Sequence, residues 1–221
     1  MHPRPTSIPL LLLFAASSAG CAGGPRTGGS GGSASCPSDR TVAPGTQDEV
    51  ERLAGCTSLS GVTIRTGAPL DLAPLRSLET ITGDLVIGPT VGLEELSLAE
   101  LREVRGSIHV VSNNSLAGLF LPRLERAGRI AVEGNSALTT ISMPRLDAVE
   151  SSLIVSGNGG LELLDVNAVT RIGKDLVVTD NPKLALVEAA RLTSVLEVRV
   201  EDNRGLPEAQ VQALRAKTPA P

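Results

Sequence analysis

The 221-residue sequence nearly lacks aromatic residues: it has no Trp, no Tyr and only two Phe, Phe14 and Phe120. We expect Phe14 to be removed with an N-terminal signal, so Phe120 would be the one aromatic of the mature chain. A core without rings must be built from aliphatic side chains, which suits regular stacked layers. The scarcity of rings also disfavours carbohydrate binding by stacking.

An excess of basic charge is also missing, as the chain has 20 Lys and Arg, 24 Asp and Glu, and a net charge of -4. No basic stripe stands out, and nucleic-acid binding needs one to neutralise phosphates. The chain has two His and three Cys. We therefore expect no metal site, no cofactor and no nucleic-acid partner.

Residues 1–20 have the features of an export signal. His2 and Arg4 precede a short apolar run at 10–16, which is too short to span a bilayer. The segment Ser18-Ala19-Gly20-Cys21 resembles a bacterial lipobox, although that family usually has Leu where Ser18 stands. The resemblance implies lipidation of Cys21, and Ala22 in place of Asp after it implies the outer membrane. An ordinary signal with a coincidental Cys is the alternative.

Residues 21–35 combine this Cys with a stretch that is mostly Gly and Ser, which behaves as a flexible tether. A tether directly after an anchoring Cys would hold a folded domain away from the membrane. We therefore expect an exported protein, lipid-anchored to the outer membrane and facing either the periplasm or the cell surface.

Cys36 and Cys56 lie at the edge of the folded region, and in an exported protein a disulfide is their simplest interpretation. Its loop would stabilise the fold by about 3 kcal/mol in the chain-entropy model. A short helix is predicted between the two Cys. Thr46 and Glu49 fit a capping box and Gly55 can end the helix, while one face is apolar. The residues of that face are Val50, Leu53 and Ala54.

Seven similar segments of 22 or 23 residues follow. Each begins with an apolar residue and has a second apolar residue two positions later. Asn usually follows five positions after the first residue, which we call the fifth position, and Leu follows eight positions after that first residue. The first residues are Val62, Leu85, Ile108, Ile130, Leu153, Leu176 and Val198. Further apolar residues recur at offsets 11, 13, 16 and 19. Such a period is typical of solenoids, and one coil could not bury enough surface to fold alone, so the coils must stack.

The fifth position carries a column of amides: Asn113, Asn135, Asn158, Asn181 and Asn203. A row of polar ligands is one interpretation. A structural role is favoured, because Asn suits turns and stacked amides can satisfy one another. The first two coils carry Gly67 and Thr90 at this position, so the column starts late.

Leu stands three residues after each Asn rather than two, which distinguishes the pattern from leucine-rich repeats and resembles the receptor L-domain family. The segments 55–61 and 81–87 are similar to that family's turns. The resemblance covers about residues 36–217. It implies a mainly β, right-handed parallel β-solenoid of about seven coils with short helical caps at both ends. Some relatives have a Cys near the C-terminus, where this chain has Ala209 as a possible equivalent.

These features predict a cap at 36–61, coils at 62–205, a second cap at 206–217 and a frayed tail at 218–221. Pro207 suits the first turn of the second cap, and Val211 and Leu214 share one face.

We expect no enzymatic activity. His109 is at an outward strand position with Ser107 and Ser112 nearby, but no further feature supports a catalytic triad. Glu133 and Glu201 are two coils or more apart, which is too far for a pair of glycosidase carboxylates.

Strand side chains alternate between two faces, so two outward columns can be written from the repeat. The first is Thr63, Val86, His109, Ala131, Ile154, Val177 and Arg199; the second is Arg65, Gly88, Val111, Glu133, Ser156, Thr179 and Glu201. We take as the candidate binding face Val86, His109, Val111, Glu133, Ile154, Val177 and Arg199.

Exposed apolar side chains in a contiguous patch often mark an interface. Two other interpretations stay open: the β-branched residues merely suit strands, or another segment covers them. We expect a monomer that binds a protein partner through this face; the alternative is a structural spacer of the envelope without a specific ligand.

Overall fold

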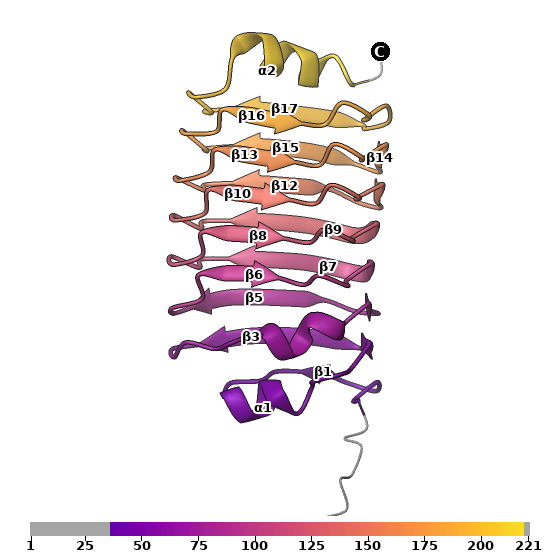
Figure 1. Ribbon diagram of the computed structural model, residues 1–221. Helices are drawn as coiled ribbons and strands as arrows, with labels where there is room; N and C mark the ends of the chain where they lie inside the picture. Colours follow the sequence, from indigo (N-terminus) through magenta and orange to yellow (C-terminus); the bar gives the residue numbers. More distant parts are fainter. Residues whose placement is uncertain (1–35, 219–221) are drawn as a thin grey trace, which may run out of the picture. The chain divides into compact units, whose positions relative to one another are not determined.

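The computed structural model describes residues 36–218, so the predicted signal, Cys21 and the tether lie outside the described residues. The described region is a right-handed parallel β-solenoid of seven coils, with two sheets running along the stack and a helix at each end (Figure 1). This confirms the predicted fold class.

The larger sheet, sheet A, runs in the order β1-β3-β5-β7-β9-β12-β15-β17. These strands are β1 (Thr41–Val42), β3 (Gly61–Thr66), β5 (Leu85–Thr90), β7 (Glu103–Val111), β9 (Arg126–Glu133), β12 (Leu153–Ser156), β15 (Asp175–Thr179) and β17 (Glu197–Glu201). Short strands continue it around a corner: β2 (Ser58–Leu59), β4 (Thr80–Ile81), β11 (Ala148–Val149) and β14 (Arg171–Ile172).

The second sheet, sheet B, has five strands in the order β16-β13-β10-β8-β6. They are β6 (Glu95–Ser97), β8 (Gly118–Phe120), β10 (Thr140–Ser142), β13 (Leu163–Asp165) and β16 (Leu186–Glu188). The first coil instead carries a 3-10 helix, η1 (Ala73–Ser77).

The core between the sheets is aliphatic, as predicted. In the coil that begins at Leu153, the inward residues pair in register with those of the coils on either side, as in Ile130↔Leu153↔Leu176. The residues at offsets 8, 11, 13, 16 and 19 are buried in this coil, namely Leu161, Leu164, Val166, Val169 and Ile172. Val198, which begins the last coil, is only partly buried because no further coil covers it.

The corner before sheet A is tight because the backbones of successive coils touch there. A Cβ built on Gly128 would lie 2.4 Å from the carbonyl oxygen of Arg105, and one on Gly173 would lie 2.1 Å from that of Glu150. Both distances are shorter than any van der Waals contact. Glycine at these positions therefore sets the stacking distance of the coils.

The first cap contains α1 (Gln47–Glu51), and a disulfide joins Cys36 to Cys56 as predicted. The Glu49 carboxylate accepts the backbone N–H groups of Gly45 and Thr46, at 2.8 and 3.2 Å, which forms the expected capping box. Val50 and Leu53 are buried. Ala54 is exposed, contrary to our prediction, because α1 ends at Glu51 and the chain turns away.

The second cap is α2 (Glu208–Arg215), which buries Val211 and Leu214 against the last coil. Pro207 is the residue before α2 and does not belong to its first turn, a correction of one position. Three side chains from this end bond to backbone groups of the last two coils. Gln210 accepts the Val187 N–H at 3.1 Å, Arg215 donates to the Val200 carbonyl at 2.8 Å, and Lys217 donates to the Ala190 carbonyl. The helix thus satisfies backbone groups that another coil would otherwise meet.

Candidate functional site

Sheet A places the first predicted column in strict register. The pairs run Thr63↔Val86↔His109↔Ala131↔Ile154↔Val177↔Arg199, one residue from each coil. Neighbouring strands lie about 4.8 Å apart, so consecutive side chains of this column touch one another. The column therefore forms an in-register ridge along the face.

The apolar members of this ridge are less exposed than we expected. Val86, His109, Ile154 and Val177 are half-buried, and Ala131 is fully buried. In-register stacking explains the difference, because each branched side chain covers some of its neighbours above and below. The predicted patch is thus shallow, and the fully buried Ala131 separates Val86 and His109 from Ile154 and Val177. Only Arg199 of this column is exposed.

The second predicted column is in register only from β7 onward, as Val111↔Glu133↔Ser156↔Thr179↔Glu201. Arg65 and Gly88 do not join it, because the ladder between β3 and β5 shifts after Ile64, where Thr66 pairs with Thr90. Val111 is half-buried and Glu133 is exposed. The usable face therefore lies over β7 to β17.

The ionisable groups of this face are dispersed. Glu133 and Glu201 are three strand steps apart, about 14 Å, which exceeds the spacing of glycosidase carboxylates. The His109 imidazole has no hydrogen-bond partner among residues 36–218, so the structure does not place it with Ser107 or Ser112 in a triad. Within the same range, no group of His, Cys, Asp and Glu could hold a metal ion.

The Asn column is buried and fully bonded, which supports its structural interpretation. Asn158 Nδ2 donates to the Val132 carbonyl at 2.9 Å, and its Oδ1 accepts both the backbone N–H and the side-chain amide of Asn135 at 3.0 Å. The same pattern links the column from its first amide to its last; its members are Asn113, Asn135, Asn158, Asn181 and Asn203. Thr90 extends it by donating to Asn113 at 2.7 Å. None of these amides is free to hold a ligand.

Sheet B carries an apolar feature that we did not predict. Leu163 and Leu186 are paired neighbours on its outer side, and Leu186 is 38% exposed. The Phe120 ring lies across Gly118 of the same strand and is half-buried. The repeat does indicate this pair, since Leu163 and Leu186 each lie ten positions after the first residue of their coil. We predicted outward columns only for sheet A.

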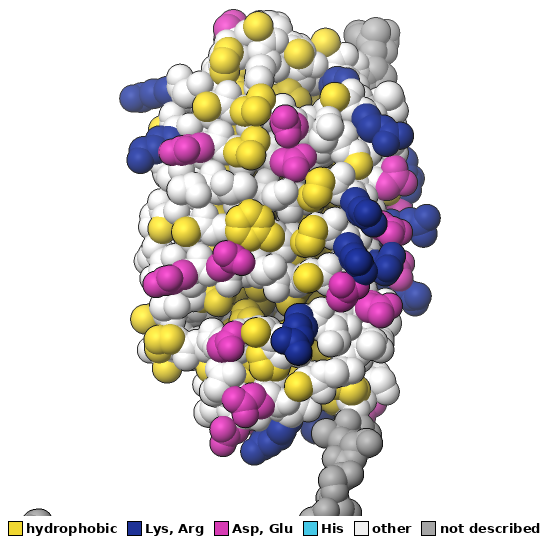
Figure 2. All heavy atoms as spheres, in the orientation of Figure 1, with side chains coloured by type: hydrophobic (Ala, Val, Ile, Leu, Met, Phe, Trp, Pro, Cys, Tyr) yellow, Lys and Arg dark blue, Asp and Glu magenta, His cyan; other side chains and the backbone are white. Residues whose placement is uncertain are grey.

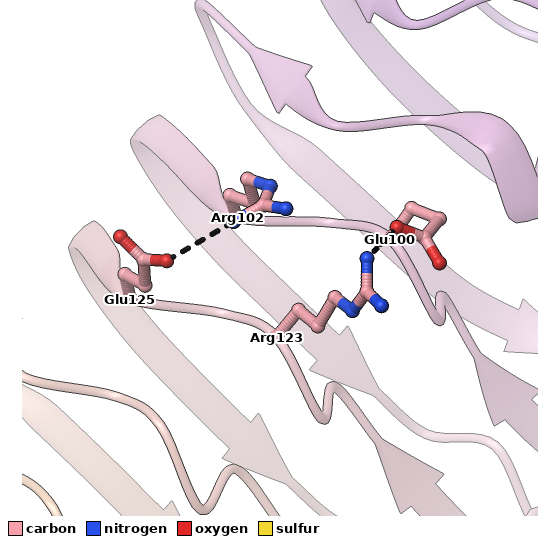
Figure 3. Close-up of polar contacts among 4 residues, drawn as sticks. All are labelled: Glu100, Arg102, Arg123 and Glu125. Carbon is pink, nitrogen blue, oxygen red and sulfur yellow. Dashed lines mark hydrogen bonds and ion pairs between the residues drawn. The ribbon is translucent and has the colours of Figure 1, made fainter.

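Charged side chains gather along the narrow side that joins the end of sheet B to the start of sheet A (Figure 2). Arg102 pairs with Glu125 at 3.4 Å, Arg123 pairs with Glu100, and these pairs link the two neighbouring coils (Figure 3). Exposed pairs of this kind contribute about 0 to 1 kcal/mol each. These ion pairs are those of a solvated surface, because none of their four side chains is buried.

Hollows lie at both ends of the stack. One of about 640 Å³ lies between β17 and α2, bordered by Glu201, Asp202 and Arg215. Another, of about 510 Å³, lies beside α1 and is bordered by Arg40, Pro44 and Glu49. Both are open and belong to the caps, so neither forms an enclosed ligand site.

Comparison with protein-family models, with curated proteins and with solved structures gives no match in any of the three. Within the described residues, neither helix has the length and apolar character needed to cross a bilayer.

Proposed function

We propose that the chain is an envelope-anchored lipoprotein whose solenoid, of the receptor L-domain type, recognises a protein partner through the candidate binding face. The observation that carries the proposal is the in-register ridge of Val86, His109, Ile154 and Val177 on sheet A. A rigid, flat sheet holds these side chains in fixed positions, which lowers the entropy lost on binding.

The composition of the face supports a protein as the partner. Half-exposed aliphatic groups form its middle, while Glu133, Thr179 and Arg199 supply polar groups at its margin. An apolar centre with a polar rim is the usual anatomy of a protein–protein interface. The near absence of rings in the chain argues against a sugar that stacks on them.

The second candidate is a structural spacer of the envelope without a specific ligand. The shallow exposure of the ridge favours it, because the same side chains already stabilise the sheet by contacting one another. The two functions differ in whether binding of a partner depends on which side chains the candidate binding face carries.

A paired substitution distinguishes them. In intact cells of the source organism, proximity cross-linking of the wild-type chain is compared with the Ile154→Glu, Val177→Glu variant. The control is Leu163→Glu, Leu186→Glu, which charges an equally adjacent aliphatic pair on sheet B. If the chain recognises its partner through sheet A, the cross-linked partners should disappear only in the Ile154→Glu, Val177→Glu variant. Circular dichroism should show that this variant keeps its fold. The same partners on both variants would support the spacer instead.

The anchor is tested separately with Cys21→Ser. Palmitate labelling should mark the wild-type chain and not the variant, and the variant should be mislocalised. Label that remains on the Cys21→Ser chain would overturn the lipid anchor. An activity of the purified chain that is lost in a stably folded His109→Ala variant would overturn the non-catalytic role.

A further inference from the structure

The last coil keeps the conformation of the inner coils, although no coil follows it. The residue before the Asn of the column has φ +56° at Asp180 and φ +54° at Asp202. The Asn203 side chain also sits as in the inner coils, since its Nδ2 donates to the Val178 carbonyl at 2.7 Å and to the Glu201 carbonyl at 2.9 Å. The backbone groups of β17 and its turn therefore point to where a further coil would lie.

The inner coils show which atoms such backbone groups bind. The Gly157 N–H donates to the Thr179 carbonyl of the next coil at 3.1 Å. The Asn158 N–H donates to Asn181 Oδ1, also of the next coil, at 3.0 Å. The end of each inner strand thus offers N–H groups to two kinds of oxygen, a strand carbonyl and the side-chain oxygen of an Asn.

In the last coil, the equivalent N–H groups of Asp202 and Asn203 have no acceptor among residues 36–218. The Val200 N–H points to the same end, because the N–H and C=O of one strand residue point the same way and the Val200 carbonyl accepts Arg215 of α2. All three donors line the hollow of about 640 Å³ between β17 and α2. Asn203 is only 8% exposed, so its N–H is a costly donor to leave unbonded.

We propose that this edge binds an extended segment of another polypeptide, which lies parallel to β17 and has an Asn just after the paired stretch. Two carbonyls of the segment accept the Val200 and Asp202 N–H groups, and the side-chain oxygen of its Asn accepts the Asn203 N–H. This is strand addition to a sheet edge, in which backbone bonds supply affinity and side chains supply selectivity. The Asn203 side chain takes no part, because its amide is already bonded to two carbonyls.

The charges around the hollow favour a neutral Asn over an acidic residue and a segment that carries Lys or Arg. Three carboxylates border the hollow, those of Glu201, Asp202 and Glu208. The cations on its border are Arg204 and Arg215, and Arg215 is already bonded to a strand carbonyl. A segment with positive side chains near its Asn therefore complements this border.

A second folded copy of the chain does not offer such a segment. The Asn column of a folded copy is buried. Its first strand, β1, is followed by Ala43 and Pro44, whose side chains have no oxygen. The occupant is therefore an extended stretch of a different polypeptide. The inference does not depend on the partner proposed for sheet A, and either can fail alone.

The probe is a synthetic peptide with the sequence of residues 174–183, acetylated, amidated and fluorescently labelled. Within the fold this stretch accepts the bonds described above from the preceding coil, and it has Lys at both ends. Fluorescence anisotropy with the purified full chain carrying Cys21→Ser should show saturable binding at about 10 mM salt, where the Debye length is about 30 Å. The matched peptide with Asn181→Leu should bind at least about fivefold more weakly, because the Asn203 N–H then has no acceptor.

Nuclear magnetic resonance locates the bound peptide. The backbone N–H signals of Val200, Asp202 and Asn203 should shift, and these groups should exchange with solvent more slowly when the peptide is present. Signals that change only elsewhere, such as at β1, would overturn the proposal.

Two protein variants test the assigned contacts. Arg215→Met frees the Val200 carbonyl for an N–H of the segment, so it should bind the peptide at least about threefold more tightly. The control, Gln212→Met on the same helix, loses only a bond to Glu208 and should bind as wild type does. Glu201→Gln combined with Glu208→Gln should bind about threefold more weakly at about 10 mM salt.

The charge control is Glu51→Gln combined with Glu94→Gln, which removes two exposed carboxylates away from the hollow and should leave the affinity unchanged. No saturable binding, equal binding of the Asn181→Leu peptide, an Arg215→Met chain no tighter than its control, or an equal loss in the charge control would each overturn the proposal. A wild-type chain that associates with itself and thereby excludes the peptide would also overturn it, because the occupant is then a second copy.

Discussion

Asn158 and Asn181 are linked by two hydrogen bonds to one oxygen: the backbone N–H and the side-chain amide of Asn158 both donate to Asn181 Oδ1, at 3.0 and 3.2 Å. The two residues lie 23 positions apart and occupy the same turn of consecutive coils. Each amide in the column thus closes its own turn and bonds the turn of the preceding coil. The column fastens one side of the stack where no sheet is present.

Removing an amide from the middle of this column should be costly. Asn158→Ala leaves the buried backbone N–H of Asn135 without its partner. It also removes one bond each from the Val132 carbonyl and from Asn135 Nδ2, which keeps the Val110 and Glu133 carbonyls. A buried orphan costs about 1 to 3 kcal/mol and each other lost bond about 0.5 to 1.5 kcal/mol, so we expect a loss of about 3 to 5 kcal/mol. Urea unfolding followed by far-UV circular dichroism measures it, since the chain has no Trp or Tyr for fluorescence.

The end of the column provides the comparison. Asn203 has no later amide to bond and is 8% exposed, whereas Asn158 is fully buried. Asn203→Ala frees the equivalent groups of Asn181 and Val178 but loses no bond to a later amide. It should therefore cost less than Asn158→Ala by about one hydrogen bond, about 0.5 to 1.5 kcal/mol. A melting temperature of Asn158→Ala equal to wild type would refute the buried turn role.

Two glycines should respond to alanine for different reasons. Gly157 has φ +66°, and a Cβ there would meet no atom closer than 3.7 Å, so Gly157→Ala carries only the left-handed backbone penalty of about 1 to 2 kcal/mol. A Cβ on Gly173 would lie 2.1 Å from the Glu150 carbonyl oxygen. Gly173→Ala must push neighbouring coils apart and should cost more than Gly157→Ala. Free energies of unfolding of the two variants, measured side by side, check the order; the reverse order would contradict the close approach of the coils.

The first cap should lose stability in acid through Glu49. The backbone N–H groups of Gly45 and then Thr46 donate to its carboxylate and lower the pKa of Glu49 below its ordinary value. In the unfolded chain the pKa of Glu is about 4.3. Because the pKa of Glu49 is lower in the folded chain, the carboxylate stabilises the fold above that pH. This stability is lost as the pH falls through the folded-state pKa. Wild type should therefore exceed Glu49→Gln in melting temperature at neutral pH, with the difference shrinking toward pH about 2. A difference that stays constant with pH would show that the carboxylate charge does not act here.

Stacking is the reason the sequence predicted so much of the fold. A residue such as Leu161 must face inward in every coil at the same offset, so the repeat alone identifies the core and the Asn column. The two Cys were predictable as well, because a disulfide between Cys36 and Cys56 needed only their position at the edge of the repeat. Each of these features depends on position within one coil.

The remaining features depend on how coils fit against one another. The ridge residues Ile154 and Val177 point outward, as the strand alternation predicted. How far they are exposed depends on how closely the neighbouring side chains cover them. The break at Gly88 is a local departure that a period cannot reveal.

The last strands should attract other strands if the second cap is altered. Gln210 on α2 accepts the N–H of Val187 in β16, and Arg215 donates to the Val200 carbonyl of β17. Replacing them with Gln210→Leu and Arg215→Met removes both bonds while keeping α2 a favourable helix. The freed backbone groups lie at a sheet edge, so we expect end-to-end association and a stability loss of about 1 to 2 kcal/mol.

Association through these edges should persist at about 1 M salt, where contacts between exposed charges are screened, and sedimentation velocity at that salt measures it. Gln212→Leu is the matched control: its side chain bonds to Glu208 within α2 and not to a strand. It makes the same chemical change on the same helix without removing a bond to the sheet edge, and it should leave the chain monomeric. Equal association of the Gln212→Leu control and the double variant would mean that added apolar surface causes it, and not the lost edge bonds.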